Sequence, residues 1–193
     1  ETFTNLFVQP GQYFFSVTHG IRDIKKGNIE TPYKILVISR SFLNEEKEPN
    51  DNPYTATGIT DQSVIKGYFS PGQNSLNNEQ KNMMKEVDWY KFNIALADNN
   101  PALIDLSLTG VTGVDSVISI LNSGMEEILT VDSAGTGEGE SVSDFGIKES
   151  GVYYVQVSSK NFLFNHEIPY ELKLDFKVFD PNSELEPNNS YEK

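Results

Sequence analysis

The chain contains no cysteine among its 193 residues. A disulfide framework, a thiolate zinc site and a cysteine nucleophile are therefore excluded. No apolar run reaches the length that crosses a membrane, so we expect no membrane insertion. No stretch keeps the hydrophobic stripe of a helix for more than a few residues either. Strands must therefore supply the core of this protein.

Basic residues and histidine are scarce as well. Against 28 Asp and Glu stand 15 Lys and Arg, which gives a formal net charge of −13. This balance argues against nucleic acid or an anionic membrane as a partner and favours divalent cations. Histidine occurs only at His19 and His166, outside any His-Glu-x-x-His motif, and no Gly-x-Ser-x-Gly motif is present. We therefore expect no enzymatic activity, with a hydrolase as the weaker alternative.

Alternation of apolar and polar residues is the dominant pattern. In residues 88–94, Tyr90, Phe92 and Ile94 share one face with Asp88, while the residues between them point the other way. Similar runs occupy residues 64–69, 103–108, 117–121, 128–131, 142–147, 151–157 and 170–178. In two of these runs we expect a full inward row, made of Ile104, Leu106 and Leu108, and of Tyr170, Leu172, Leu174, Phe176 and Val178. The sequence predicts an all-β fold, an antiparallel β-sandwich of jelly-roll type.

The sequence repeats itself internally. Gly11 matches Gly151, Tyr33 matches Tyr170, and Glu48 matches Glu186, at offsets of 140, 137 and 138 residues. We interpret residues 1–44 as the C-terminal strands of a preceding repeat, residues 45–180 as one complete module and residues 181–193 as the linker to a following repeat.

Residues 1–44 should supply a three-stranded arm, which is too small to hold a core alone. We expect the arm to dock on the complete module, to dock on another chain, or to remain poorly ordered. If it docks, an exposed sheet edge is the natural acceptor.

An acidic segment, residues 46–51, joins the arm to the module. Within six residues it offers four oxygen-bearing side chains: Glu46, Glu48, Asn50 and Asp51. Hard cations such as calcium take six to eight oxygen ligands and tolerate irregular geometry. Asp88, at the head of a strand with Glu86 close before it, could complete such a site. The alternative is a solvated acidic linker that binds nothing.

Several runs together carry a family resemblance. The acidic segment is followed by Val-Ile-Lys-Gly-Tyr-Phe at 64–69, Val-Asp-Trp-Tyr-Lys-Phe at 87–92 and Gly-Val-Tyr-Tyr-Val-Gln-Val at 151–157. In this order the chain resembles the bacterial pre-peptidase C-terminal domain family, which includes the collagen-binding domains of clostridial collagenases. The resemblance covers residues 45 to about 180.

The resemblance implies a jelly-roll sandwich, appended in most members to a secreted hydrolase, with calcium joining the linker to the sandwich in the collagen-binding members. Carried over by position, it implies ligands at Glu46, Glu48, Asn50, Asp51 and Asp88, with backbone oxygens near Gly67 and Tyr68. Lys85 stands where a further acid is expected, so we assign the last ligand to Glu86. The second linker, residues 184–189, lacks a partner aspartate and is expected to bind no cation.

Aromatic residues suggest a binding surface. Trp89 and either Tyr153 or Tyr154 should present aromatic area on the sheet, which suits a protein ligand. The resemblance points the same way, since members of the family use a tyrosine-rich sheet face for collagen. The alternative is that these side chains lie at an edge, covered by a loop or by the arm.

Together these features predict a non-catalytic, calcium-stabilised binding or spacer module from an exported bacterial protein, secreted or on the cell surface. Its expected partners are an extracellular protein or matrix-like ligand and neighbouring repeats of the same chain. The alternative is a substrate-binding or maturation appendage of a secreted peptidase.

Overall fold

The computed structural model describes residues 12–17, 32–38, 43–70, 87–96, 100–160 and 163–177. These residues contain nine β-strands and no helix. The strands are β1 (Thr57–Gly58), β2 (Ser63–Phe69), β3 (Val87–Ile94), β4 (Ala102–Leu108), β5 (Ser116–Leu121), β6 (Glu127–Val131), β7 (Glu140–Ile147), β8 (Gly151–Ser159) and β9 (Asn165–Lys177).

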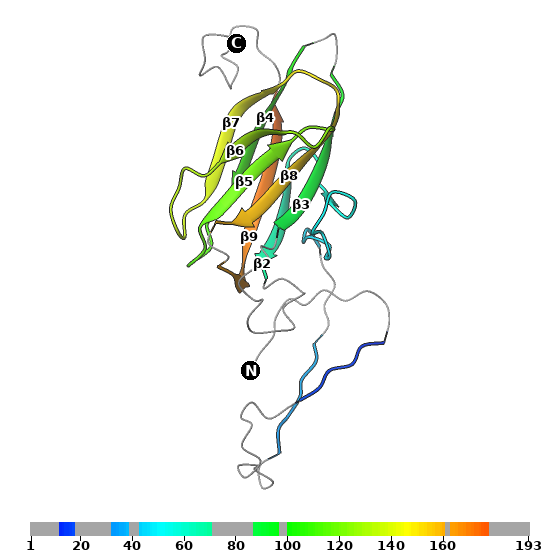
Figure 1. Ribbon diagram of the computed structural model, residues 1–193, viewed down its shortest axis with the longest axis vertical. Helices are drawn as coiled ribbons and strands as arrows, with labels where there is room; N and C mark the ends of the chain where they lie inside the picture. The colour runs from blue at the N-terminus through cyan, green and yellow to red at the C-terminus, as the bar shows by residue number, and fades with distance from the viewer. Residues whose placement is uncertain are drawn as a thin grey trace. The chain divides into compact units, whose positions relative to one another are not determined.

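The strands form two sheets that pack face to face (Figure 1). One sheet has the order β1-β3-β8-β5-β6 and the other has the order β2-β9-β4-β7. Consecutive strands such as β2 and β3, β4 and β5, and β8 and β9 lie in opposite sheets, which is the jelly-roll arrangement. The predicted all-β sandwich is confirmed. One detail differs from the antiparallel expectation, because β1 pairs with β3 in parallel.

The core lies between the sheets, where the alternating rows meet. On β3, Tyr90, Phe92 and Ile94 are buried together with Asp88, as the alternation predicts. The inward row predicted for β4 is buried too, and on β9 the row from Tyr170 to Leu174 is buried while Phe176 is half-buried. Val178 lies outside the described residues. These three strands therefore bury one face each, as a two-layer sandwich requires.

All eight alternating runs are strands, with ends that shift by up to five residues. The sequence did not indicate β1, because a strand of two residues is too short to show alternation. Among the described residues, no helix is long and apolar enough to cross a membrane.

The three-stranded arm expected in residues 1–44 is not formed in the part that the structure describes. Residues 12–17 and 32–38 have no strand assignment, and every one of them is exposed. The strand prediction is therefore wrong for these two ranges.

Candidate metal site

The acidic segment approaches the sandwich along the edge of the four-stranded sheet. Glu45 forms an isolated parallel bridge with Lys66 of the edge strand β2. The backbone N–H of Glu46 donates to the Lys66 carbonyl at 2.8 Å, and the Lys66 N–H donates to the Asn44 carbonyl at 2.8 Å. These bonds fix the position of Glu46 along β2, and so the point at which its side chain enters the sandwich.

A few residues later the same segment is bonded to the five-stranded sheet. The Lys47 N–H donates to Thr57 Oγ1 at 3.1 Å, and the Trp89 N–H of β3 donates to the Asn50 carbonyl at 2.9 Å. The segment therefore crosses from the edge of one sheet to the other. Its Glu46 and Glu48 side chains lie close to Asp88 of β3.

Glu46 is almost fully buried, with 6% of its surface exposed, and it is bonded from both sheets. Its Oε1 accepts the Tyr68 N–H of β2 at 2.7 Å. Its Oε2 lies 2.7 Å from the Tyr90 hydroxyl of β3 and 3.2 Å from the Tyr170 hydroxyl of β9. The Asn50 side-chain amide donates to the same oxygen at 3.2 Å. The carboxyl group thus joins the acidic segment to three strands of the sandwich.

Two phenols connect Glu46 to Asp88. The Tyr90 and Tyr170 hydroxyl oxygens are 2.6 Å apart, and the Tyr170 hydroxyl donates to Asp88 Oδ2 at 2.5 Å. Three short oxygen–oxygen contacts, Glu46–Tyr90, Tyr90–Tyr170 and Tyr170–Asp88, therefore share the network. Two phenols supply only two protons, since each hydroxyl donates once. With Tyr90 donating to Glu46 and Tyr170 donating to Asp88, a third proton, carried by one of the two carboxyl groups, is needed to complete the chain of hydrogen bonds.

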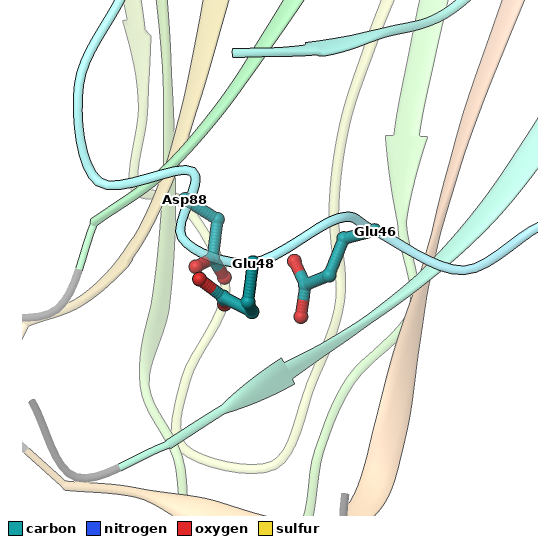
Figure 2. Close-up of side chains that lie close together, drawn as sticks. All are labelled: Glu46, Glu48 and Asp88. Atoms are coloured by element: carbon teal, nitrogen blue, oxygen red, sulfur yellow. The ribbon is translucent and has the colours of Figure 1, made fainter. Parts of the chain in front are cut away.

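The carboxylates of Glu46, Glu48 and Asp88 come together at this point. Their nearest oxygens all lie within 4.8 Å of one another. Figure 2 shows the Glu48 and Asp88 carboxylates facing each other, with the Glu46 carboxylate beside them. Asp88 is 1% exposed, and Glu48 is half-buried. Three acids are thus held close in a site with little water.

Burial and like charge act on these acids in the same direction. Burial, and next the Glu48 charge, raise the pKa of Glu46 from 4.5 to about 7. Burial likewise raises the pKa of Glu48 and that of Asp51. The raised pKa of Glu46 agrees with the proton count in the phenol network. Near neutral pH a proton on Glu46 and a cation bound at the site would therefore compete for the same negative charge.

Two buried oxygens of the site have no hydrogen-bond partner among the described residues. They are Glu48 Oε1 and Asn50 Oδ1, and Asn50 is fully buried. The other Glu48 oxygen accepts the Asn50 backbone N–H at 3.0 Å, which turns the two side chains toward the same space. A buried oxygen without a donor carries a free-energy cost that a cation would remove. The donor set is made of oxygen alone, which suits a hard cation.

The structure brings together Glu46, Glu48, Asn50 and Asp88 of the predicted ligands. Asp51 is exposed and does not belong to the group of three carboxylates, so its role as a ligand stays a prediction. Glu86 and the second linker lie outside the described residues. The carbonyl oxygens predicted near Gly67 and Tyr68 also stay a prediction.

Sequence reasoning missed two kinds of residue at the site. Tyr90 and Tyr170 were expected as core residues only, yet their hydroxyls bind the carboxylates. A tyrosine in an inward row needs a polar partner, and this was the available signal. Gly67 was named only for a nearby backbone oxygen, and the close packing at this glycine was not predicted. A Cβ atom built on Gly67 would overlap the Tyr170 phenol and lie 2.6 Å from Glu46 Oε2.

The aromatic residues proposed for ligand binding lie on opposite faces of their sheet. Trp89 and Tyr154 pack edge to face, with ring centroids 6.0 Å apart, and both are half-buried on the outer face. Tyr153 points inward, is 6% exposed and stacks on Phe92. Its predicted role in ligand binding is therefore wrong, because β8 directs it into the core.

His166 does not belong to the site. His166 lies in β9, where its ring stacks on Phe164 with centroids 6.3 Å apart. His19 lies outside the described residues.

Of the comparisons with known proteins, the one with solved structures found a similarity. No family model matches the sequence, and no curated protein matches it. Among solved structures, the chain is similar to the pre-peptidase C-terminal domain of a collagenase from Bacillus anthracis. The sequence identity is 21%, the match covers 65% of this chain and 100% of that domain, and the TM-score is 0.47.

Proposed function

We propose that this chain is a non-catalytic, calcium-stabilised module that serves for binding or as a spacer in an exported bacterial protein with tandem repeats. The observation that supports the proposal is the buried group of Glu46, Glu48 and Asp88, together with the two buried oxygens that lack a donor.

A cation removes the main cost of the acidic group. Two unit negative charges 4.8 Å apart repel by about 3 kcal/mol at the effective dielectric constant of a protein surface, and the site holds three such groups. Protons relieve part of this repulsion at low pH. A divalent cation relieves it at neutral pH and also satisfies Glu48 Oε1 and Asn50 Oδ1.

Calcium fits the donor set better than the other common metals. The side chains offer carboxylate and amide oxygens, and neither imidazole nor thiolate is among them. Zinc and other transition metals favour nitrogen and sulfur ligands, and magnesium demands near-octahedral geometry. Glu46, Glu48, Asn50 and Asp88 would hold the ion. When bound, it would supply positive charge at the junction of the acidic segment and both sheets.

A bound cation would stabilise the joint through mass action. A ligand that binds only the folded state at 100 times its dissociation constant adds about 2.7 kcal/mol to the free energy of unfolding. Because the acidic segment is bonded to β2 and to β3, this energy would also hold the segment against the sandwich. The joint between the module and whatever precedes it would then be stiff, as a spacer requires.

The test is thermal unfolding of the chain in chelator, in millimolar calcium and in millimolar magnesium. We expect calcium to raise the midpoint by about 5–10 °C, which corresponds to about 2.7 kcal/mol in a domain of this size. Magnesium should raise it much less. Glu48→Gln should abolish the calcium effect, whereas Glu171→Gln, which removes an acid from the outer face of β9, should preserve it. Superimposable curves in chelator and calcium would show that the acidic segment is only a solvated linker.

The outer faces of the two sheets differ in a way that favours binding over a pure spacer role. On the four-stranded sheet the outer face carries ion pairs, such as Lys177 with Asp105 at 2.7 Å. On the five-stranded sheet the outer face carries Trp89 and Tyr154. Aromatic side chains add contact area at low entropic cost, so this second face is the better surface for an extracellular protein or matrix-like ligand.

Trp89 is the only tryptophan of the chain, so its fluorescence reports on this face directly. We expect a triple-helical Gly-Pro-Pro peptide to shift its emission in a saturable manner. Tyr154→Ala should weaken binding at least about tenfold, since aromatic anchors are the usual hot spots. Tyr153→Phe, which alters the inward face, should leave binding unchanged. No saturable change would contradict this ligand class and favour the spacer role.

A further inference from the structure

The last residues of β3 lack a neighbouring strand on the side that faces away from β8. β1 pairs with β3 in parallel over only two residues, Thr57 and Gly58. A last backbone bond joins the Ile59 N–H to the Lys91 carbonyl at 2.9 Å. β3 continues to Ile94, and beyond Lys91 no described residue pairs with it on this side. The five-stranded sheet therefore has an unfilled place beside the end of β3.

The backbone groups of Asn93 face this unfilled place. In a strand, the N–H and carbonyl groups of every second residue are directed to the same neighbour. The Trp89 N–H donates to the Asn50 carbonyl on the edge side, and the Lys91 carbonyl accepts a bond there too. Asn93 is the next residue in this series, and no described residue bonds to its backbone on that side. One donor and one acceptor, spaced as in a strand, are therefore open to another peptide backbone.

A pocket of about 380 Å³ opens at the same part of β3. Two aromatic rings line it, Phe92 and Phe176, whose centroids lie 6.1 Å apart. Ile59 and Val152 add further apolar surface. Asn93 lines the pocket as well, so the open backbone groups and the apolar surface belong to one site. The volume falls within the range of roughly 300–1,000 Å³ that is usual for ligand pockets.

Two charged side chains lie at the pocket and form no ion pair with any described residue. They are Lys91 of β3 and Asp61 of the loop between β1 and β2. The Phe176 N–H donates to Asp61 Oδ1 at 2.6 Å, which holds this carboxylate beside the pocket. The site therefore offers one charge of each sign next to an apolar surface. A partner that brings an acid and a base together with an apolar side chain is complementary to it.

We propose that this edge of β3 binds an extended peptide segment of another polypeptide. The peptide adds a strand beside Asn93, places an apolar side chain in the pocket, and carries an acid for Lys91 and a base for Asp61. A peptide backbone is the chemistry that supplies an acceptor and a donor at strand spacing together with side chains at alternate positions. The inference goes beyond the proposed function, since it involves neither a cation nor the outer-face pair of Trp89 and Tyr154.

The geometry of a strand sets the pattern of this peptide. Side chains two positions apart lie on the same face, about 7 Å from one another. The apolar residue that enters the pocket is therefore flanked, two positions away on either side, by residues that reach the rim. An acid on one side meets Lys91, and a base on the other meets Asp61. Their order depends on whether the peptide runs parallel to β3, as β1 does, or antiparallel to it.

The probe for the test is a fluorescein-labelled peptide, Lys-Thr-Leu-Thr-Glu-Thr, whose Leu is the apolar anchor. The order Glu-Thr-Leu-Thr-Lys-Thr covers the opposite direction. Fluorescence anisotropy is measured with the full chain in chelator, so that calcium plays no part. We expect saturable binding of one of the two orders. Replacing Leu by Asp in that peptide should weaken its binding at least about tenfold, because the side chain that fills the pocket is lost.

A substitution in the pocket and a matched one at the far edge of the same sheet locate the site. Val152→Asp places a charge in the pocket and should abolish binding. Ile128→Asp is the matched control, because Ile128 lies on the opposite edge strand β6 and is 36% exposed, compared with 38% for Val152. It should leave the peptide affinity unchanged. Thermal unfolding of both variants checks that each is folded at the temperature of the binding measurement.

An exchange of charges decides the question even if Val152→Asp does not fold. Lys91→Glu should weaken binding of the peptide about threefold or more, as expected for the loss of an exposed ion pair. The same peptide with its Glu replaced by Lys should regain this affinity with the variant. A merely structural effect of the substitution would not be reversed in this way. Lys148→Glu, at an exposed lysine of the β7–β8 loop that does not line the pocket, should show neither effect.

Three results would overturn the proposal. The first is the absence of saturable binding of both peptide orders at millimolar concentration. The second is equal binding of the peptides with Leu and with Asp, which would show that the pocket takes no side chain. The third is self-association of the unlabelled chain that Val152→Asp abolishes, since the edge would then belong to a second copy. None of these results affects the calcium-dependent unfolding that tests the proposed function.

Discussion

The metal-free protein should lose stability as the pH rises through the neutral range. Glu46 has a pKa of about 7 in the folded state and 4.5 as its ordinary value, because burial and the Glu48 charge oppose its ionisation. A raised acid pKa means that the folded state binds the proton more tightly than the unfolded state does. The contribution is therefore complete below pH 4.5 and is lost progressively as the pH rises to about 7. Glu48 and Asp51, whose pKa values are also raised, act in the same direction.

The size of the effect follows from the shift. Each pKa unit corresponds to about 1.4 kcal/mol, so the Glu46 shift amounts to about 3 kcal/mol between pH 4.5 and 7. In a domain of this size that loss lowers the unfolding midpoint by about 6–12 °C. The phenol network also predicts a loss of stability as the pH rises, because removing its third proton leaves one of the three short oxygen–oxygen contacts without a hydrogen.

Urea unfolding in chelator at pH 5, 6, 7 and 8 measures this directly. We expect the free energy of unfolding to fall across the series, and saturating calcium to restore most of it at pH 8. Glu46→Gln should make the dependence clearly shallower, while the slope from Glu48 and Asp51 remains. Glu171→Gln, an outer-face substitution beside Lys66, should keep the full slope. A metal-free stability that is flat or rises between pH 5 and 7 would refute the account of Glu46.

Three further predictions concern single side chains, and urea unfolding measures each of them. Gly67→Ala should lower the free energy of unfolding by at least about 2 kcal/mol, because its Cβ would overlap the Tyr170 phenol. Gly58→Ala, with no atom within 4 Å of the new Cβ, should be nearly neutral. Equal effects of the two substitutions would contradict the packing described at Gly67. Tyr170→Phe should cost about 2–3 kcal/mol, because it removes the donor to a buried carboxylate, while the exposed Tyr54→Phe should cost nothing measurable. Glu140→Ala should cost about 2–4 kcal/mol, since its buried carboxylate accepts three hydrogen bonds from the β6–β7 loop; an unchanged midpoint would show that the loop holds without it.

The alternating runs predicted most of the fold because each long strand buries one face. On β3 the polar and apolar positions alternate regularly from Tyr90 to Ile94, so the inward row of Tyr90, Phe92 and Ile94 followed from the sequence. On β8 they do not separate, since Tyr154 is as aromatic as its inward neighbour Tyr153. The facing there is decided by pairing with β3 and β5, which is long-range information.

The sequence predicted which acidic and amide side chains make up the candidate site, but not the hydrogen bonds that connect them. The oxygen-rich sequence of the acidic segment and the aspartate at the head of β3 identified Glu46, Glu48, Asn50 and Asp88. Alternation cannot tell that a segment lies across two sheets, because this depends on hydrogen bonds to Lys66 and Trp89 that are remote in sequence. For the same reason the phenols of Tyr90 and Tyr170 were assigned to the core. Their polar ends are defined only when the sheets meet.

The path of the acidic segment has a consequence for solubility. Edge strands expose unpaired N–H and carbonyl groups that can recruit another molecule, and proteins commonly block them. Here the segment occupies the Lys66 N–H and carbonyl on β2 and the Trp89 N–H on β3, at the open side where the two sheets meet. Its carboxylates also place negative charge beside both edges. Detaching the segment would expose the edge strand β2 and the Trp89 N–H of β3, whose outer neighbour β1 has only two residues, so the same residues that gather the acids also protect the sandwich against edge-to-edge aggregation.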